Sequence, residues 1–576
     1  MGVRVAQFAG FCMGVRRALN IALNAAHRRR SGVYTLGPLI HNPQVIDLLK
    51  RRGICPIEIK DVQPGETVVI RAHGIAPEER SALEAAGGVI CDATCPRVMR
   101  VQRTIERWVG RGYEVVVVGD RGHAEVVGLL GFSRGHGTVV ESPEEARELR
   151  RHEKLCVVAQ TTQNREVFSQ TVEELRKRAE EIEVFDTLCD STSRRQREVL
   201  DLAKSSDAVV VVGGRASANT RRLAEICEAT GTPTFHIETE EELDPNALKG
   251  FSQIAVTAGA STPNWMINRA VGRIEEILGI EPSVPGKFVR WATNLNLQLG
   301  LGAACLTVFG ALIQRFVPRV EHVLVSVLYV LAMHTINTLT DVESLELNEP
   351  RRARFYVRYR KGLLVLASAC GVGALLAASR LGWLPLAIVA VSSLAGLIYN
   401  LSIFPPAFAR LTGYRRLRDI PGSRDLFTAL AWSIMTAVVP ALSAGALKLG
   451  FPAALALLLP FTIAFIRSVT LDLRDIEGDR MVGNETIPVA LGRRWTKALV
   501  LVVVSGSLAL AAVSAAFGWA PGAAYCAVPP LLFVYVYLYL YHIRAVATGP
   551  FLDWLVDSNF VVVALSLAAC LLLGRS

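Results

Sequence analysis

The segment that decides the fold of the first half is a run of valines followed by a polar turn, Val115-Val116-Val117-Val118-Gly119-Asp120-Arg121-Gly122-His123. A short apolar run rich in β-branched residues predicts a buried strand. The same order of apolar run, polar turn and helix-like segment recurs within residues 1–280, at 67–74, 155–161, 209–217 and 254–261. Short strands that alternate with helices indicate parallel sheets whose two faces are covered. The first half is therefore expected to have an α/β fold.

Residues with hydrogen-bonding side chains stand where these strands end. They are His41, His73, His123, Thr161, Ser217 with Asn219, and Ser261. Parallel sheets bind ligands beyond the carboxyl ends of their strands, and helix N-termini there favour anions such as phosphate. For any one residue, a helix cap or a loop histidine is an equally good explanation, but recurrence at six strand ends favours a binding site. The Gly-Lys-Ser/Thr signature of a nucleotide P-loop does not occur.

Three cysteines, Cys12, Cys95 and Cys189, stand in three separate turns that each lead into a helix-like run. Iron–sulfur clusters that transfer electrons normally have four protein ligands. Three thiolates can hold a cluster and leave one iron open to a substrate oxygen, which suggests a redox enzyme. Cys91 lies four residues before Cys95, so a local metal-binding pair is a rival interpretation. It is weakened because Cys91 ends a strand-like run.

The composition changes near residue 290. Uncharged stretches follow at 291–314, 323–340, 362–379, 383–409, 426–447, 449–466, 498–541 and 558–574. A membrane-spanning helix needs about 20 residues, and the stretch at 498–541 is long enough for two. We therefore predict an all-α transmembrane domain of nine helices at 291–576, which a linker at 281–290 joins to a soluble domain at 1–280.

The net charge of +10 is a topology signal. If the N-terminus is cytoplasmic, the loops on the same side carry sixteen Lys and Arg and the opposite loops carry four. This asymmetry follows the positive-inside rule. It predicts a multi-pass protein of the inner, cytoplasmic membrane, with its soluble domain in the cytoplasm. Nucleic-acid binding is not expected, because no basic stripe with interleaved aromatic residues occurs.

The remaining cysteines are interpreted as packing residues, among them Cys526 and Cys570 in the apolar spans. A cytoplasmic location of the soluble part argues against disulfides.

Two acidic clusters stand at the ends of predicted spans. Asp472, Asp475 and Asp479 have the spacing i, i+3 and i+7, which places them on one helical face. Asn337 and Asp341 form the first cluster, and Glu343 and Glu346 follow them. Such carboxylates can bind Mg²⁺ together with phosphate oxygens. A solvated acidic loop is the alternative.

Eight motifs of the first half resemble, in order, those of the 4-hydroxy-3-methylbut-2-enyl diphosphate reductases, the last enzymes of the methylerythritol phosphate route to isoprenoids. The motifs are Ala9-Gly10-Phe11-Cys12-Met13-Gly14-Val15, His41-Asn42-Pro43, Ala72-His73-Gly74, Asp92-Ala93-Thr94-Cys95-Pro96, Gly122-His123-Ala124-Glu125-Val126, Gln160-Thr161-Thr162, Asp186-Thr187-Leu188-Cys189 and Ala258-Gly259-Ala260-Ser261-Thr262-Pro263.

The resemblance implies a three-lobed α/β protein around a central [4Fe–4S] cluster held by Cys12, Cys95 and Cys189. It implies reductive dehydroxylation of 4-hydroxy-3-methylbut-2-enyl diphosphate to isopentenyl and dimethylallyl diphosphate. Glu125 would supply the proton, and a ferredoxin or flavodoxin would supply the electrons. The substrate-binding residues implied are His41, His73, His123, Thr161, Ser217, Ala218, Asn219 and Ser261. Relatives often have two adjacent serines where this chain has Ser217-Ala218, so one hydroxyl donor is lost.

The second half is similar to the UbiA-type intramembrane prenyltransferases. Asp472-x-x-Asp475-x-x-x-Asp479 resembles their second motif. Asn337 and Asp341 fit their first motif, Asn-x-x-x-Asp-x-x-x-Asp, but its third place is Leu345, with Glu346 beside it. The resemblance implies Mg²⁺-assisted transfer of a prenyl group from its diphosphate to a lipophilic acceptor. Arg351, Arg352 and Arg415 are interpreted either as phosphate contacts or as topology or lipid-headgroup residues.

Two alternatives stay open. The membrane half could be a non-catalytic anchor, which the Leu345 departure allows. The soluble half could be a redox or iron sensor, although the strand-end donors and Glu125 speak against it.

Overall fold

A computed structural model of the chain describes residues 2–28, 32–280, 284–399, 401–402, 404–405, 414, 416–448, 450–543 and 551–572. The chain forms two compact units, Met1–Glu281 and Pro282–Ser576, and each is described by itself.

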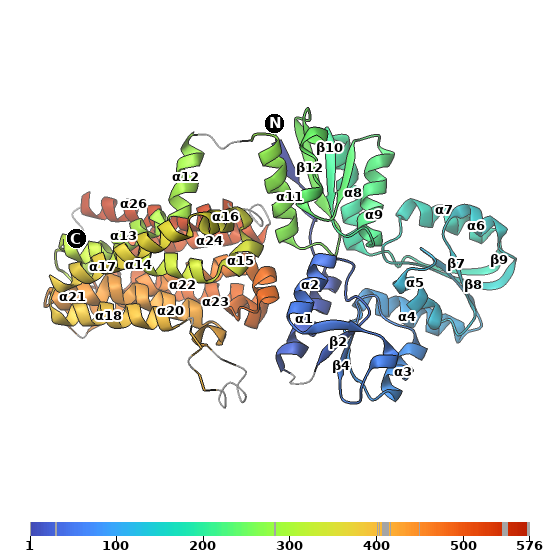
Figure 1. Cartoon of the computed structure of the whole chain (residues 1–576), viewed down its shortest axis with the longest axis horizontal. Coiled ribbons are helices and arrows are strands. Elements are labelled where there is room, and N and C mark those ends of the chain that lie inside the picture. The colour runs from blue at the N-terminus through green and yellow to red at the C-terminus, as the bar shows by residue number, and fades with distance from the viewer. Residues whose placement is uncertain are drawn as a thin grey trace. The chain divides into compact units, whose positions relative to one another are not determined.

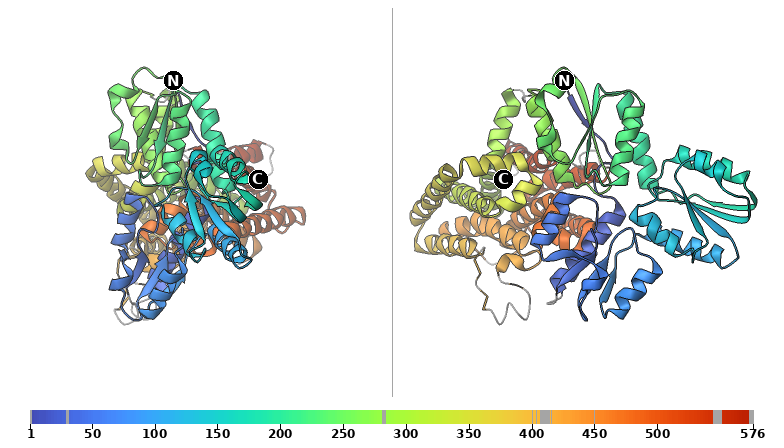
Figure 2. Two further views of the ribbon diagram at one scale, coloured as in Figure 1. Left: turned by 90° about the vertical axis from the view of Figure 1, so that its right-hand side faces the viewer. Right: turned by 45° about the vertical axis from the view of Figure 1, so that its right-hand side comes forward.

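The first unit contains three four-stranded parallel sheets. Figures 1 and 2 show them as green, blue and cyan lobes grouped around a common centre. In spatial order the sheets are β1(Gly2–Val5), β12(Gln253–Ala258), β10(Ala208–Val212) and β11(Thr234–Ile237); β3(Ile54–Ile57), β2(Val33–Leu36), β4(Thr67–Ile70) and β5(Val89–Asp92); and β7(Gly137–Val140), β6(Glu114–Val118), β8(His152–Ala159) and β9(Ala179–Phe185). The predicted α/β fold with three lobes is confirmed.

Helices alternate with these strands along the chain. They are α1(Met13–Arg28), α2(Pro43–Arg51), η1(Ile59–Asp61), α3(Pro77–Ala85), α4(Pro96–Val109), α5(Ala124–Gly131), α6(Pro143–Glu148), α7(Arg165–Arg176), α8(Asp190–Lys204), α9(Ala218–Ala229), η2(Glu240–Glu242), α10(Pro245–Leu248) and α11(Asn264–Ile277). Several begin at residues that suit a first helical turn. Asn42, for example, caps α2 by accepting a bond from the Val45 N–H at 3.1 Å, and Pro43 follows it.

The valine run of β6 explains why both faces of its sheet are covered. Val115 and Val117 pack against Ile105 and other residues on one face, whereas Val116 and Val118 pack with a second set on the other. All four valines are at most 1% exposed. Such burial of alternate side chains on opposite faces is what a parallel sheet between two helix layers requires.

Among the described residues of the second unit, the secondary-structure elements are all helices. Its helices are α12(Val284–Asn294), α13(Leu297–Ile313), α14(Val320–Thr340), α15(Val342–Asn348), α16(Pro350–Arg358), α17(Arg360–Ser379), α18(Trp383–Ile398), η3(Leu417–Asp419), α20(Ser423–Ser433), the π-helix η4(Ile434–Val438), α21(Val439–Ser443), α22(Phe451–Val482), α23(Ile487–Ala516), η5(Gly522–Ala527), α24(Val528–His542), α25(Phe551–Asp557) and α26(Asn559–Leu572). The predicted linker at 281–290 is helical from Val284 onward, because Pro285 fits a first helical turn and apolar residues follow it.

Among the described residues, seven helices are long and apolar enough to cross a bilayer, and the bent pair α12–α13 raises this number to eight. The fourth of the nine predicted spans, at 383–409, contains α18, an apolar helix of 16 residues that is too short for this count. Large apolar side chains on these helices point outward, including Val365, Leu376 and Val391, each more than 60% exposed. Lipid contact accounts for such exposure, and the chain is a multi-pass membrane protein.

Cys526 and Cys570 form a disulfide that joins η5 to α26. The interpretation of these two cysteines as separate packing residues is therefore wrong. Their separation of 44 residues gave no hint that the two helices pack together.

Candidate functional sites

The three lobes contribute to one site in the same way. In each lobe a cysteine follows an edge strand: Cys12 follows β1, Cys95 follows β5 and Cys189 follows β9. Polar residues follow the two central strands of each sheet, and they are His41 and His73, His123 and Thr161, and Ser217 and Ser261. Because all strands are parallel, these nine residues lie at the carboxyl ends of their sheets, where such folds bind ligands.

Backbone hydrogen bonds tie each cysteine to the loop after a central strand. The N–H of Cys12 donates to the Ala260 carbonyl at 3.1 Å, and that of Cys95 donates to Ala72 at 2.9 Å. The N–H of Cys189 donates to Thr161 at 2.9 Å. The cysteines also lie at the first turns of α1, α4 and α8, where free N–H groups stabilise a thiolate.

The Cys12 and Cys95 thiols lie beside Gly14, where a larger side chain than that of glycine would not fit. A Cβ added to Gly14 would lie 2.8 Å from the Cys95 Sγ and 3.8 Å from the Cys12 Sγ. Burial raises the pKa of the Cys95 thiol, and the neighbouring Cys12 and Cys189 thiols raise it further. Three converging thiols fit the ligand set of an iron–sulfur cluster.

The spacing of the thiols also suits a cluster better than a single ion. Within the described parts of the chain, only three histidines bring metal-binding atoms within 4.8 Å of one another. The three cysteine sulfurs therefore do not all lie within this distance of one another, as is expected of thiolates bound to three different irons. Cys91 lies within β5, and the groups that act on Cys95 include Cys12 and Cys189 rather than Cys91. The rival pair receives no support.

Arg195 on α8 holds the loop that precedes Cys12 close to the end of β12. Its guanidinium donates to the Gly10 carbonyl at 2.6 Å and to the Ala258 carbonyl at 3.2 Å, and the residue is 5% exposed. Its charge also acts on Cys12 and Cys189. A buried cation at this place would offset part of the negative charge of thiolates that bind a metal cluster.

His41, His73 and His123 form a cluster whose ring centroids are 5.0 to 5.8 Å apart. Burial lowers the pKa of all three imidazoles, and that of His123 falls to about 4. The His123 Nδ1 accepts a bond from the Glu125 N–H at 3.2 Å, which leaves the proton of the neutral ring on Nε2. Neutral imidazoles of this kind can donate to phosphate or bind a metal ion.

Arg71 favours phosphate over a metal ion as the ligand of the three histidines. It lies two residues before His73 at the end of β4, and its positive charge further lowers the pKa of all three histidines. Its buried Nε has no hydrogen-bond acceptor among the described residues. A cation beside the cluster would repel a metal ion and attract a phosphate group. The histidine cluster is therefore better suited to an anion.

The third lobe adds donors at the start of α9. The Ser261 Oγ lies 3.4 Å from the Ser217 Oγ and 3.3 Å from the His41 carbonyl oxygen. Asn219 is 5% exposed, yet its side-chain oxygen and nitrogen have no partner among the described residues. Ala218 is buried beside it and offers no polar side-chain atom. Unpartnered buried amide groups at a helix N-terminus indicate a bound polar ligand.

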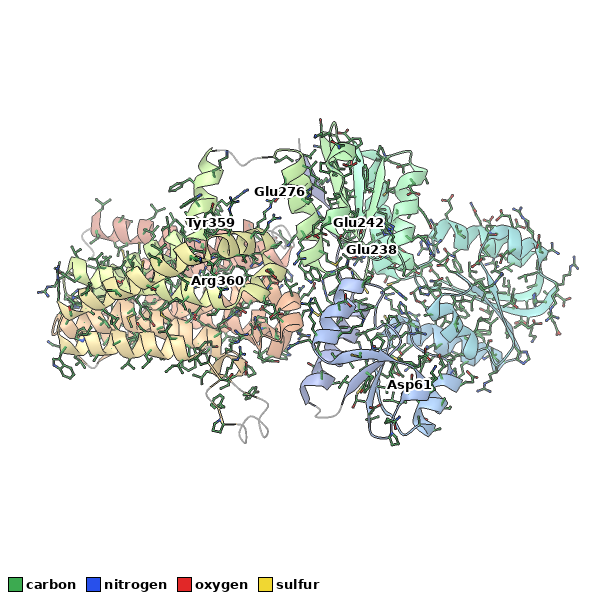
Figure 3. All side chains as sticks on the ribbon, in the orientation of Figure 1. Asp61, Glu238, Glu242, Glu276, Tyr359 and Arg360 are labelled. Carbon is green, nitrogen blue, oxygen red and sulfur yellow. A yellow bond between two sulfur atoms is a disulfide. The ribbon has the colours of Figure 1, made fainter. Side chains whose placement is uncertain are left out.

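Two glutamates of the following segment hold the loop that carries Ser217. The Arg215 N–H donates to Glu238 Oε1 at 2.6 Å, and its guanidinium donates to Glu242 at 2.6 Å. Figure 3 labels both glutamates in the green lobe. These bonds keep the start of α9 in place.

Glu125 is a buried carboxyl group that two bonds fix in place. Thr161 donates to it through its N–H at 2.7 Å and through its hydroxyl at 2.9 Å. Burial raises the pKa of Glu125 to about 7, although the Thr161 bonds lower it in part. A carboxyl group with this pKa can carry a proton near neutral pH.

In the membrane unit, a cavity of about 650 Å³ brings both acidic clusters together. Asn337, Asp341, Asp472, Asp475 and Asp479 all line it. Arg352 lines it as well, whereas Arg351 is not among the lining residues and Arg415 lies outside the described residues. Apolar side chains line the cavity as well, among them Met333, Phe427 and Trp432.

Arginines bind the carboxylates of this cavity. Arg474 donates to both oxygens of Asp475, at 2.6 and 2.7 Å, to Glu349 at 2.9 Å, and to Asp553. Arg424 donates to Asp472 and lies 3.7 Å from Asp341. The site thus mixes cations with acidic groups, which is suited to a phosphate ester bound with metal ions.

Sequence reasoning missed several of these residues. Arg71 adjoins the Ala72-His73-Gly74 motif and Arg474 lies inside an acidic motif, so both residues could have been singled out from the sequence. Arg195, Arg424 and Asp553 carried no such signal, because they reach their sites only through helix packing.

Each half of the chain matches a known protein family. Residues 3–275 match the LytB protein family, and residues 301–552 match the UbiA prenyltransferase family. The 4-hydroxy-3-methylbut-2-enyl diphosphate reductase of Aquifex aeolicus (strain VF5) is 44% identical over 276 residues, which are 47% of this chain and 96% of the relative. The enzyme of the same name from Pelobacter propionicus (strain DSM 2379 / NBRC 103807 / OttBd1) is 45% identical over 277 residues, 48% of this chain and 99% of the relative. A solved structure of such a reductase, described as the terminal enzyme of the non-mevalonate pathway, is 43% identical. The match covers 48% of this chain and 100% of that one, with a TM-score of 0.39.

The fold and the three-thiol site define the first unit as a three-lobed α/β protein of the LytB class, followed in the same chain by a UbiA-type membrane unit. The chain belongs to the 4-hydroxy-3-methylbut-2-enyl diphosphate reductase family.

Proposed function

We propose that the soluble unit removes the hydroxyl group of 4-hydroxy-3-methylbut-2-enyl diphosphate reductively, giving isopentenyl and dimethylallyl diphosphate. The observation that carries this proposal is the recurrence in all three lobes of a thiol after an edge strand and polar donors after the central strands. Enzymes of this name are 44 and 45% identical to the first half of the chain.

We assign Cys12, Cys95 and Cys189 as the ligands of the [4Fe–4S] cluster that the family implies. When bound, such a cluster supplies electrons and an iron site that activates the leaving hydroxyl group. The protein contributes the ligand geometry, which the three backbone bonds of the cysteines maintain, and a close approach at Gly14.

The diphosphate of the substrate is assigned to the histidine cluster and the start of α9. Arg71 would supply a permanent positive charge, because the imidazoles of His41, His73 and His123 are neutral at pH 7. The neutral imidazoles would act as hydrogen-bond donors, together with Thr161, Ser217, Asn219 and Ser261. Ala218 contributes its backbone only. Charge-assisted bonds of this kind position a phosphate group firmly.

Glu125 is assigned as the proton donor. Its pKa of about 7 keeps a substantial fraction of the carboxyl group protonated in neutral solution. Thr161 would hold the carboxyl group in one orientation through its two bonds. Loss of the substrate hydroxyl as water requires such a proton.

An anaerobic assay of the full chain tests this function. Protein reconstituted with iron and sulfide would be given 4-hydroxy-3-methylbut-2-enyl diphosphate and reduced methyl viologen, which stands in for a ferredoxin or flavodoxin. We expect both five-carbon diphosphates to appear. Cluster-loaded protein that forms neither product would defeat the reductase proposal and favour the sensor alternative.

The membrane unit is proposed to transfer a prenyl group from a prenyl diphosphate to a lipophilic acceptor. Asn337, Asp341, Asp472, Asp475 and Asp479 line its cavity and are assigned to Mg²⁺ and diphosphate binding. The apolar side chains that line it suit a prenyl chain. A membrane assay with radiolabelled prenyl diphosphates of different lengths tests this, with Asp479→Asn as the control. Unchanged lipid products in that variant would favour the anchor alternative.

The proposed location is the inner membrane, with the soluble domain, 1–280, in the cytoplasm and a short connection to a membrane domain that occupies most of 291–576. The positive charge of the loops supports this orientation. If α18 crosses the bilayer, the number of spans is odd. The disulfide between Cys526 and Cys570 then faces the opposite, oxidising compartment, where disulfides persist.

A further inference from the structure

The acidic residues of the membrane cavity do not gather around one point. Within the described parts of the chain, no three carboxylates place oxygens within 4.8 Å of one another. Arginines lie between them instead. The following inference rests on the proposed prenyltransferase function and concerns how this chain neutralises the diphosphate.

Neither Leu345 nor the two nearest glutamates, Glu346 and Glu349, supply the third ligand of the first motif. Leu345 lines the cavity but offers no oxygen. Glu346 is exposed and is not among the lining residues. Glu349 does line the cavity, but it accepts bonds from Arg474 at 2.9 Å and from Arg352 at 3.5 Å. Neither glutamate therefore restores the lost metal ligand.

Asp475 is also occupied. Both of its oxygens accept bonds from Arg474, in a bidentate arrangement that is among the strongest ion pairs in proteins. Asp475 could bind a metal ion only by giving up these two bonds, and Arg474 would then keep only Glu349 and Asp553 as acidic partners among the described residues.

Arg424 takes a central place among the remaining carboxylates. It donates to Asp472, and its nitrogens lie 3.7 Å from Asp341 and 4.0 Å from Asp479. Asp341 directly follows α14, and Asp472 and Asp479 lie on α22, so one guanidinium links both acidic motifs. In a two-ion site, a second metal ion would make this link.

A small set of oxygens is left for a metal ion. Asp472 Oδ2, Asp479 Oδ2 and Asn337 Oδ1 are buried and have no hydrogen-bond donor among the described residues. Asp472 and Asp479 are 4% and 1% exposed, and both line the cavity. The second oxygen of Asp479 is fixed by the Ser344 hydroxyl at 2.9 Å. Mg²⁺ commonly binds one or two carboxylates and completes its shell with phosphate oxygens and water.

We propose that the membrane unit binds a single Mg²⁺ ion, through Asp472, Asp479 and Asn337, and that Arg424 provides the positive charge that a second ion would supply at the prenyl diphosphate. Leu345 is then compatible with an active enzyme.

Metal counting tests the proposal without an activity assay. The full chain in detergent would be titrated with Mn²⁺ in the presence of inorganic diphosphate, and bound Mn²⁺ would be counted by electron paramagnetic resonance. The Asp479→Asn variant supplies the background from the soluble unit. We expect one Mn²⁺ per chain above this background.

Two variants should raise the count. Leu345→Asp restores a third ligand to the first motif and should bring the count to two. Arg424→Leu leaves three carboxylates without their cation and should also bring it to two, because a second ion then neutralises them. Glu346→Gln is the matched control and should leave the count at one. Thermal unfolding of each variant shows whether it is folded.

Two ions, or none, in the unaltered chain would overturn the proposal, and so would a count that neither variant raises. A rise in Leu345→Asp alone would overturn the role given to Arg424. Absence of prenyl transfer alongside the expected counts would defeat the proposed function and leave the metal inference intact.

Discussion

The two units of this chain handle charge at their sites in opposite ways. In the soluble unit, the pKa values of three strand-end histidines are lowered, and the Asn219 side chain has no bond among the described residues. In the membrane unit, carboxylates and arginines are paired with one another, as around Arg474. Polar groups at the strand ends of a soluble domain can remain without a partner until a ligand binds, whereas an isolated charge at membrane depth has a high free-energy cost. In the first unit, polar groups without a partner among the described residues therefore indicate the ligand site. In the second unit, where most charges are paired, the few carboxylate oxygens that lack a donor among the described residues indicate it.

The largest effect is expected from Cys95→Ser, which removes a central thiol from the preorganised site. Reductase activity should fall by more than the roughly 10–100-fold typical of losing a residue outside the ligand shell of a metal site. The visible absorption of the reconstituted cluster should decline with it. Cys91→Ser is the matched control and should retain both. Retention by Cys95→Ser, or loss in Cys91→Ser, would favour the rival cysteine pair.

Glu125→Gln should lower kcat by about 10²–10⁴-fold, the usual contribution of a general acid. Glu125 must be protonated to act, and its pKa is about 7, so kcat/KM of the unaltered enzyme should decline as pH rises through 7. The variant should lack this decline because an amide does not titrate. Methyl viologen suits the measurement because its reduction potential does not depend on pH. A variant that keeps the same decline would show that another group donates the proton.

Asp553→Asn tests whether pairing stabilises the membrane unit. Asp553 is one of three acidic partners of Arg474. Losing a bond to a charged group costs about 1.5–3 kcal/mol, so the unfolding temperature in detergent should fall by several degrees. Glu343→Gln, at an exposed position of the same unit, should have no effect. Equal unfolding temperatures in both variants would contradict the stabilising role of this network.

Arg71→Leu should have the smallest effect. If Arg71 supplies charge to the diphosphate, KM should rise about tenfold, which corresponds to about 1.4 kcal/mol, with a smaller change in kcat. Arg147→Leu, which removes an exposed cation of the same unit, is the control. A change in kcat without a change in KM would instead indicate a role near the reacting atoms.

The sequence allowed much of the soluble site to be predicted, because strand periodicity alone places His41, His73, His123 and Thr161 at strand ends. It could not show which strands lie at sheet edges. That order depends on hydrogen bonds between segments far apart in the chain, and it puts the three cysteines on edge strands and the donors on central ones. Arg195 was missed for the same reason.

In the membrane unit, the run of apolar stretches determined that helices cross a bilayer, since hydrophobic length alone decides this. The sequence also showed that Leu345 replaces a carboxylate. Only tertiary structure decided what compensates for it, because Arg424 on α20 meets Asp341 and Asp472 through helix packing. The disulfide between Cys526 and Cys570 likewise depends on the packing of η5 against α26. Local pattern thus determined the elements and most of the reactive groups, and contacts between distant segments decided how their charges are balanced.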